Sequence, residues 1–384
     1  MKQFKFIFNF FFGKFIFSLI KKKKFLLVDN RFLGSFVNFM YYKLSFNKDV
    51  IIIFLPSFFN RNKKSYLQYT LFEQAYYDVT KKKLNSLYNS ILYFFFKIID
   101  DKYKSLLRFE WSKDIFNLFI KNDKIIFDPT IKNIRNKDAN FSKLKNNNFL
   151  LFSCRDNAYK EKIHGNSLNY HSYRNESLIN YEKSFASLKK QFNIVRFGSV
   201  VNEKIKNDGI FDYSFSEDRN EINDLWLMKN CYIYIGTGSG PDILAMNYQK
   251  PIVYTNWPHP PNIFGFHSPA NLIFKKIFDK KKNEYIPYKK LLNKENIGVS
   301  GKPMGLLSTN QEYEENNLIC EENSADEIEN AIKELDRFLR KKYIFNSTNQ
   351  KQFKNFYSIN LNNPIANNFY ISDYFINKNK ELFV

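Results

Sequence analysis

Short apolar runs alternate with amphipathic segments along the second half of the chain. Four runs are each short enough for one buried strand: 149–153, 193–197, 231–235 and 251–254. Between them, apolar residues recur at helical spacing in three segments: 178–191, 222–228 with Asn220 as its N-cap, and 242–247. The polar stretch 154–176 has neither pattern and is predicted to be irregular. Alternating strands and helices form a parallel sheet with right-handed crossovers, so we expect an α/β domain over 149–345.

The first half of the chain has a weaker pattern. The run 49–56 is apolar, β-branched and closed by proline, as in a buried strand, and 66–96 has helical spacing. The segment 136–148 is polar and rich in asparagine, which is typical of a linker. We therefore expect a separate N-terminal domain over 25–135, with the C-terminal residues 346–384 packing back on it.

The N-terminal segment 1–24 joins a phenylalanine-rich run to four lysines. Its apolar part is shorter than the ~20 residues of a membrane span, and Lys14 interrupts it. No small-residue cleavage site follows, so we do not expect a removed signal peptide. Two interpretations stay open: contact with an anionic membrane surface, or a first strand and helix with their aromatic rings in the core.

The composition narrows the class of protein. The 384 residues include 59 Lys+Arg and 38 Asp+Glu, a balance that is common in nucleic-acid-binding proteins. However, Phe, Tyr, Lys, Asn and Ile are all frequent while glycine is scarce, as A/T-rich codons would produce without any ligand. We therefore do not expect a nucleic acid as the partner. Three cysteines, and four histidines outside any metal-binding spacing, argue against a disulfide scaffold and a zinc site.

Arginine is informative because the same codon bias works against it. Four arginines fall within 65 residues: Arg155, Arg174, Arg196 and Arg219. A guanidinium group binds phosphate at two points, which lysine cannot do. Arg155 directly follows the strand at 149–153, at the edge where parallel sheets bind ligands. For Arg174 and Arg196, phosphate binding and an internal ion pair remain open alternatives.

A glycine-rich loop is the strongest local signal. The strand at 231–235 leads into Gly236, Thr237, Gly238, Ser239 and Gly240, and Pro241 then favours a helix start. Free amides at such a start, with the Ser239 hydroxyl, would bind an anion, and Asp242 lies in the same turn. The alternative is a tight turn with packing glycines. Gly198 and Asn256 follow other strands and would meet this loop at one edge.

Two residues are candidates for acid–base chemistry. Asp156 could act as a general base or could orient Arg155. His164, in the polar stretch, could serve as a base or could be an ordinary surface histidine.

An ordered set of short motifs runs from the first of these arginines to the strand after the glycine-rich loop. Its residues are Arg155-Asp156-Asn157-Ala158-Tyr159, Tyr173-Arg174-Asn175, Tyr181, Val195-Arg196-Phe197-Gly198, Asp212-Tyr213, Asp224-Leu225, and the stretches 236–242 and 250–256. This set resembles a bacterial family of glycosyltransferases found with surface-carbohydrate genes. The stretch 236–256 is also similar to the donor loop of lipopolysaccharide heptosyltransferases, with Ile243 in place of their His. Arg155 is similar in placement to the donor-binding Arg of fucosyltransferases.

The resemblance implies the GT-B fold, in which two Rossmann-like domains with parallel sheets face each other across a cleft. It also implies transfer of a hexosyl or deoxyhexosyl group from a nucleotide-diphosphate sugar to a saccharide or lipid-linked acceptor. Such enzymes commonly need no bound cofactor or metal. The diphosphate would be bound by Arg155, Arg174, Arg196 and the 236–240 loop, and Trp257 or a tyrosine would stack on base or sugar. The expected location is the bacterial cytoplasm, with peripheral contact at the inner membrane left open.

Two other functions remain as alternatives. A sugar-nucleotide epimerase with the same shape would bind the same donor without an acceptor. A non-catalytic basic protein would instead bind membranes or nucleic acid through dispersed lysines, with steep salt dependence.

Overall fold

The computed structural model describes residues 24–28, 50–54, 141, 144, 148–164, 166–260, 268–356 and 367–383. The chain divides into two compact units, 1–133 and 134–384. In the first unit, β1 (Lys24–Val28) and β2 (Val50–Phe54) pair in parallel, which confirms the strand predicted at 49–56. The predicted helix at 66–96, residues 1–23 and most of the predicted linker lie outside the described residues.

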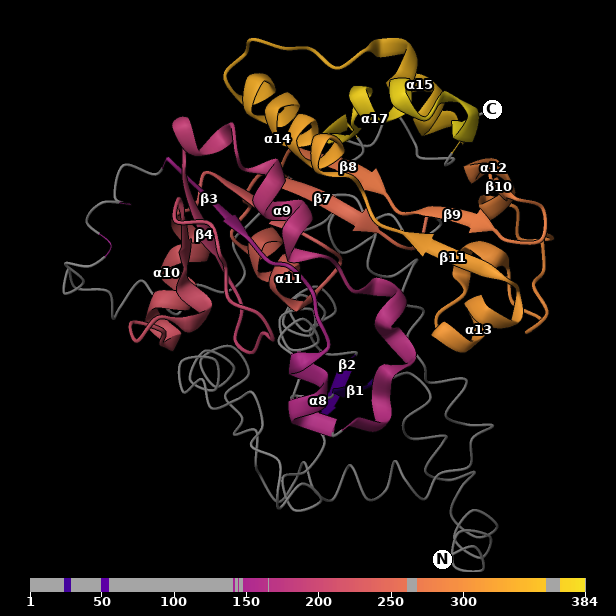
Figure 1. The fold of residues 1–384 in the computed structure, drawn as a ribbon, viewed down its shortest axis with the longest axis horizontal. Coiled ribbons are helices and arrows are strands. Elements are labelled where there is room, and N and C mark those ends of the chain that lie inside the picture. Colours follow the sequence, from indigo (N-terminus) through magenta and orange to yellow (C-terminus); the bar gives the residue numbers. More distant parts are fainter. Residues whose placement is uncertain are drawn as a thin grey trace, which may run out of the picture. The chain divides into compact units, whose positions relative to one another are not determined.

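The second unit is built on a sheet of seven parallel strands (Figure 1). Along the chain these are β3 (Phe149–Phe152), β4 (Asn193–Arg196), β5 (Ile210–Asp212), β6 (Ile233–Gly236), β7 (Ile252–Trp257), β8 (Ala270–Phe274) and β12 (Phe369–Ile371). Their order across the sheet is β12-β8-β7-β6-β3-β4-β5. The chain thus moves outward from β3 to β5, returns to β6 and moves outward on the other side. This is the strand order of a Rossmann-type sheet, and it confirms the predicted parallel α/β domain.

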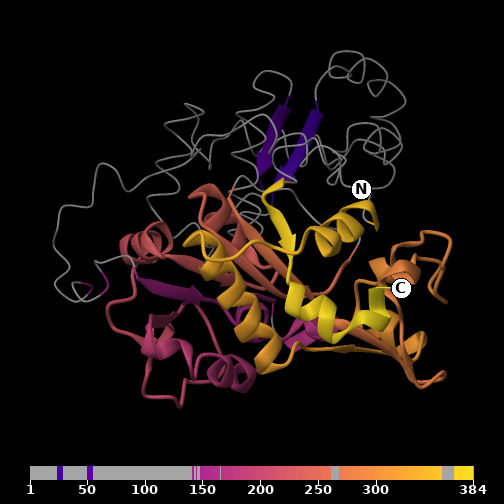
Figure 2. The same cartoon turned by 90° about the horizontal axis from the view of Figure 1, so that it is seen from above.

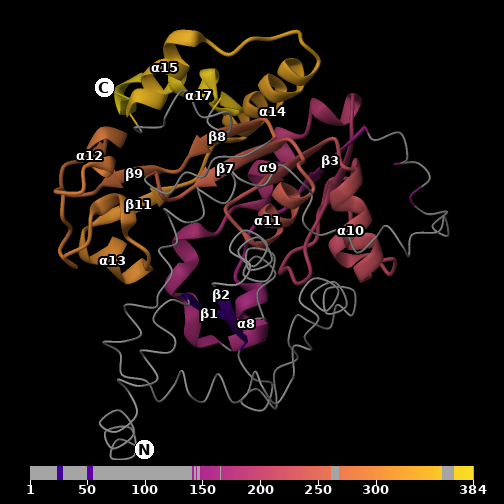
Figure 3. The ribbon, with the colours of Figure 1, turned by 180° about the vertical axis from the view of Figure 1, so that it is seen from behind.

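Helices cover both faces of this sheet (Figures 1 and 3). On one side, Phe152 stacks on Tyr181 of α9 (Leu178–Ser184), with ring centroids 5.6 Å apart. On the other, Phe149 stacks on Trp226 of α10 (Glu221–Asn230) at 6.2 Å. The helix α14 (Ala325–Leu339) contacts α9, and α11 (Gly240–Asn247) contacts α10. β3 is a continuous apolar run because both of its faces are buried.

Several element boundaries differ from the predictions. The polar stretch 154–176 is helical rather than irregular: it contains α8 (Ala158–His164) and the 3-10 helix η5 (Asn166–Arg174). The helix predicted over 178–191 ends at Ser184, and a separate turn, η6 (Leu188–Lys190), follows. The predicted Asn220 cap is confirmed, because its side chain accepts a hydrogen bond from the Asn223 amide. The short helix η7 (Tyr213–Phe215) precedes α10.

A second, smaller sheet extends from β8. Its three antiparallel strands are β9 (Lys276–Asp279), β10 (Glu284–Tyr285) and β11 (Leu318–Glu321), in the order β10-β9-β11. Three short helices lie between β10 and β11 in the chain: α12 (Tyr288–Leu292), η8 (Met304–Leu306) and α13 (Asn310–Glu315).

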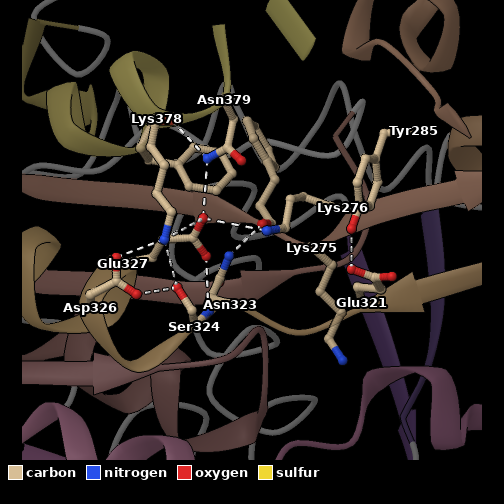
Figure 4. A network of polar contacts seen from close by, with 12 residues as sticks. Lys275, Lys276, Tyr285, Glu321, Asn323, Ser324, Asp326, Glu327, Lys378 and Asn379 are labelled. Carbon is tan, nitrogen blue, oxygen red and sulfur yellow. Dashed lines mark hydrogen bonds and ion pairs between the residues drawn. The ribbon is translucent and has the colours of Figure 1, made fainter. Parts of the chain in front are cut away.

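The C-terminal residues belong to the second unit. After α15 (Ser347–Phe356), β12 pairs with β8 and completes the large sheet, so the domain does not end at 345. The final elements are α17 (Asp373–Lys378) and η9 (Lys380–Phe383). Figure 4 shows how they are held: the buried Glu327 carboxylate of α14 accepts hydrogen bonds from Asn379 at 3.1 Å and from Lys276 of β9 at 3.5 Å.

Candidate functional site

The candidate site lies at the carboxyl ends of β3 and β6. The two strands are parallel neighbours, but the chain continues from β3 to β4 on one side and from β6 to β7 on the other. Open α/β sheets bind ligands at the point where the strand order reverses in this way. Arg155 follows β3, and the loop 236–240 follows β6. The strand order therefore brings together the two sequence features that were predicted to bind an anion.

The glycine loop is closed by Asp242 from within α11. This buried carboxylate accepts hydrogen bonds from the amides of Gly238 (2.6 Å) and Ser239 (2.9 Å) and from the Ser239 hydroxyl (3.1 Å). The Tyr234 hydroxyl donates a further bond at 2.9 Å. Burial raises the pKa of Asp242 above its usual value, and these donors partly offset that effect. Two amides and the hydroxyl that were predicted to be free for an anion are thus engaged by this capping box.

Gly238 adopts a conformation that brings Arg174 against the loop. Its φ is +75°, in the region that side chains other than glycine rarely occupy. The Arg174 guanidinium donates to the Gly238 carbonyl. A Cβ at position 238 would lie 3.3 Å from Arg174 Nη2 and 3.5 Å from the Trp257 ring. Trp257 is itself buried against the loop, with its indole N–H bonded to the His259 carbonyl, so its predicted stacking on a base or sugar has no exposed ring to use.

Arg155 and Arg174 form a pair of like charges. Burial, and then the neighbouring Arg174, lower the pKa of Arg155 to about 10. Among the described residues, no carboxylate oxygen lies within 4.0 Å of either guanidinium, and the Nε atom of each is buried without a hydrogen-bond partner. Two partly buried cations that lack a carboxylate partner would be stabilised by an anion between them.

Glu176 holds the Arg155 backbone in place. Its Oε2 accepts from the Arg155 amide at 3.2 Å and from the Tyr181 hydroxyl at 3.1 Å. Its own amide donates to the Arg155 carbonyl at 3.0 Å. Burial raises the pKa of Glu176 to about 8, although the Lys275 ammonium group lowers it. Glu176 thus fixes the main chain of Arg155 and is not within ion-pair distance of its guanidinium.

The hydrogen bonds of Glu176 continue through Tyr181 to the glycine loop. The Tyr181 hydroxyl shares a 2.6 Å hydrogen bond with Thr255 Oγ1 of β7. Thr255 in turn donates to the Gly236 carbonyl at 3.2 Å. The loops after β3 and β6 are therefore joined through buried hydroxyl groups.

A tyrosine–histidine pair borders Arg174. The Tyr173 hydroxyl and His259 Nε2 are 2.9 Å apart. Burial and the Arg174 charge lower the pKa of His259 to about 4, so the imidazole is neutral at pH 7. This neutrality keeps a third positive charge away from the two arginines.

Several predicted residues have internal partners instead. Arg196 is 1% exposed, lies 3.5 Å from the Asp212 carboxylate and donates to the Glu203 carbonyl, which corresponds to the internal ion pair. A Cβ at Gly198 would lie 3.0 Å from Val201, so this glycine provides close packing. Asn256 is buried, with φ +52°, and exchanges two 2.6 Å backbone–side-chain hydrogen bonds with Asn323.

The structure gives contacts for only one of the two acid–base candidates. The Asp156 carboxylate accepts backbone hydrogen bonds from Ala158, the first residue of α8, at 3.0 Å and from Asn202 at 2.7 Å, so its side chain joins the start of α8 to a loop rather than orienting Arg155. His164 ends α8, and its side chain lies outside the described residues.

The remaining predicted residues belong to the glycine loop. Thr237 is buried, while Ser239 and Gly240 are partly exposed.

The residues missed by the sequence analysis are Glu176 and Lys275. A single glutamate after Tyr173-Arg174-Asn175 carries no spacing signal, and one lysine among 59 basic residues does not stand out. Only the fold brings them together, because Lys275 follows β8 and donates to the Asn175 carbonyl at 2.8 Å.

Three findings complete the description of the site. Within the described part of the chain, no group of three or more His, Cys, Asp or Glu residues is placed to hold a metal ion. No helix there is long and apolar enough to span a bilayer. Comparisons of the chain with protein-family models, with curated proteins and with solved structures gave no match.

Proposed function

We propose that the second unit binds the diphosphate of a nucleotide sugar and that the protein is a glycosyltransferase. The observation that carries this proposal is the Arg155–Arg174 pair beside the 236–240 loop, at the reversal point of a Rossmann-type sheet. The diphosphate of a nucleotide sugar carries two negative charges, and each phosphate offers a pair of oxygens to the planar fork of a guanidinium group, which suits two arginines. A single carboxylate would leave one of them unneutralised.

The expected energies are sufficient for such a ligand. A hydrogen bond to a charged group contributes roughly 1.5–3 kcal/mol. Two such hydrogen bonds contribute about 3–6 kcal/mol, which overlaps the ~4–8 kcal/mol of millimolar to micromolar binding. The same charges would stabilise the diphosphate as it leaves the sugar, which is the step where negative charge develops.

The acceptor side is proposed by analogy with GT-B enzymes. The parallel pairing of β1 and β2 requires a crossover between them, as in a second Rossmann-like half. In this proposal residues 1–133 bind the saccharide or lipid-linked acceptor. Since both oxygens of Asp156 accept backbone amides, we do not assign it as the base that deprotonates the acceptor.

A thermal-shift screen tests the proposal. We expect UDP-, GDP-, CDP-, ADP- or dTDP-sugars, within one nucleotide class, to raise the melting temperature of the full chain. The shift should vanish in Arg155→Ala and persist in Arg340→Ala, which removes a surface arginine paired with Asp336 within α14 and its cap. No shift with any nucleotide sugar, or an equal shift in both variants, would contradict the proposal.

A further inference from the structure

A basic surface in the second unit lies apart from the candidate site. Residues 275–302 contain nine lysines against three acidic residues, whereas the rest of 149–384 contains 22 basic and 24 acidic residues. Codon bias acts on the whole chain and does not explain this local excess. The excess charge in this half of the chain is therefore concentrated in the β9–β10 hairpin, α12 and the turn that follows.

Most of these lysines are exposed and lack a carboxylate partner. Seven of the nine are exposed. Lys282 pairs with Asp279 at 3.6 Å, and Lys302 pairs with Glu312. The other five exposed lysines of the segment have no carboxylate oxygen within 4.0 Å among the described residues. Their charges are thus available to a partner.

Aliphatic side chains protrude beside these lysines. Val299 is 75% exposed and Ile297 is 50% exposed, on a turn closed by a bridge between Ile297 and Pro303. The turn is fixed, because the Gly298 amide bonds to the Lys302 carbonyl at 2.8 Å and the Val299 amide bonds to Asn316 Oδ1 at 2.8 Å. These hydrogen bonds hold the turn in a conformation that leaves the side chains of Ile297 and Val299 exposed.

The charged and aliphatic groups share one end of the unit. Figures 1 and 2 show the β9–β10 hairpin, α12 and the following turn at the same end, and α12 contacts η8 directly after the turn. Lysines around exposed aliphatic tips match a bilayer surface with anionic headgroups, since the ammonium groups meet phosphate and the aliphatic groups enter the acyl boundary. The segment has no arginine, and its tyrosines, Tyr285 and Tyr288, are not exposed, whereas single-stranded nucleic acid is bound by stacking on exposed rings.

We propose that Lys280, Lys281, Lys289, Lys290, Ile297 and Val299 form a surface that binds the anionic face of a phospholipid bilayer. The lysines attract the headgroups, and Val299 enters the interface. This surface is independent of the nucleotide-binding proposal, because it shares none of its residues. It is also distinct from the basic N-terminal segment 1–24.

A local probe separates this surface from other basic parts of the chain. Val299→Cys, carrying an environment-sensitive fluorophore in the full chain, is mixed with phosphatidylcholine vesicles with and without phosphatidylglycerol. We expect blue-shifted emission, and quenching by nitroxide-labelled lipids, only with phosphatidylglycerol. The same label at Ile344→Cys, 88% exposed between α14 and α15, should not respond. If the protein sediments with anionic vesicles while the Val299 label still reports water, the proposal is overturned.

A charge series tests the lysines. Replacing Lys280, Lys281, Lys289 and Lys290 with Gln should raise the lipid concentration for half-maximal Val299 signal about 600-fold, since each lysine near such a surface contributes a factor of about five. The matched control replaces four other exposed lysines: Lys190, Lys206, Lys342 and Lys351. Equal losses in both variants would indicate net charge alone and would overturn the proposal. So would selective loss of single-stranded RNA binding with no label response to vesicles.

Discussion

At the scale of single residues, Glu176 makes the stability of the protein depend on pH. Its pKa is about 8 in the folded chain and 4.5 in the unfolded chain, so between these values the folded state holds an extra proton. The contribution of Glu176 to the free energy of unfolding is therefore complete below pH 4.5. It decreases as the pH rises from 4.5 to 8 and is lost above pH 8. The slope is about 1.4 kcal/mol per pH unit within that window.

Glu176→Gln should remove this slope. We expect the free energy of unfolding of the wild type to fall between pH 6 and pH 8 by more than that of the variant, as measured by urea denaturation. Glu284→Gln, an exposed carboxylate in β10, is the control and should keep the wild-type slope. Parallel curves for all three proteins would mean that Glu176 is ionised in the folded state.

Gly238 allows a prediction with an internal control. Gly238 and Gly301 both have φ +75°, so alanine at either position should cost roughly 1–2 kcal/mol of stability through backbone strain. Only at 238 does the new Cβ meet Arg174, because nothing lies within 4 Å of a Cβ at 301. We expect nucleotide affinity to fall roughly 10- to 100-fold in Gly238→Ala and to stay unchanged in Gly301→Ala, as measured by calorimetry. Equal affinities would show that Arg174 does not depend on the shape of this loop.

At the scale of elements, the capping box of α11 organises the glycine loop. Asp242→Ala leaves the amides of Gly238 and Ser239 without their acceptor in a buried setting, which should cost about 2–3 kcal/mol. Glu312 accepts the Ser308 and Thr309 amides in the same way at the start of α13. Glu312→Ala should cost only about 1 kcal/mol, because this helix end is nearer to solvent. Guanidinium denaturation of both variants gives the difference, and equal costs would contradict a buried role for Asp242.

Most strands and helices of the large sheet could be predicted from the sequence. Both faces of β3 and β6 are buried, so their apolar runs are continuous, and Asn220 and Pro241 mark helix starts by local chemistry. The 3-10 helix η5 was not predicted because its polar sequence has no apolar stripe. It packs against α13, which lies 130 or more residues further along the chain, so the local sequence carries no signal of this contact. For example, the Tyr173 amide of η5 donates to Asn310 at 2.7 Å.

The candidate site was only partly predictable for a similar reason. Arg155 and the glycine loop follow strands, so their position at one edge could be inferred from the sequence alone. The partners of each arginine could not: Arg196 meets Asp212 through the pairing of β4 with β5, whereas Arg174 meets the Gly238 carbonyl. Which arginine stays free of a carboxylate is decided by strand pairing rather than by local sequence.

At the scale of the whole molecule, charge is divided unevenly. Residues 1–148 contain 28 basic and 11 acidic residues, and 149–384 contain 31 and 27. The overall charge of +21 therefore belongs mainly to the first part of the chain. Residues 149–384 are nearly balanced, so the Arg155–Arg174 pair and the 275–302 surface are local concentrations rather than samples of a general excess.

The pairing of two arginines without a ligand also has a cost that binding would remove. Their mutual repulsion contributes to the lowered pKa of Arg155. Replacing Arg155 with Ala should thus leave the folded protein as stable as before, or more stable, while weakening the binding of an anion. This opposite response distinguishes a ligand site from a structural cluster. Replacing Arg174 would also remove its hydrogen bond to the Gly238 carbonyl.

The most direct measurement is the calorimetric affinity of the full chain for the nucleoside diphosphate selected by the screen, with Arg174→Ala and Arg340→Ala measured beside the wild type. We predict roughly 10- to 100-fold weaker binding for Arg174→Ala and wild-type affinity for Arg340→Ala. Equal affinity in all three proteins would contradict a diphosphate site at the junction of β3 and β6.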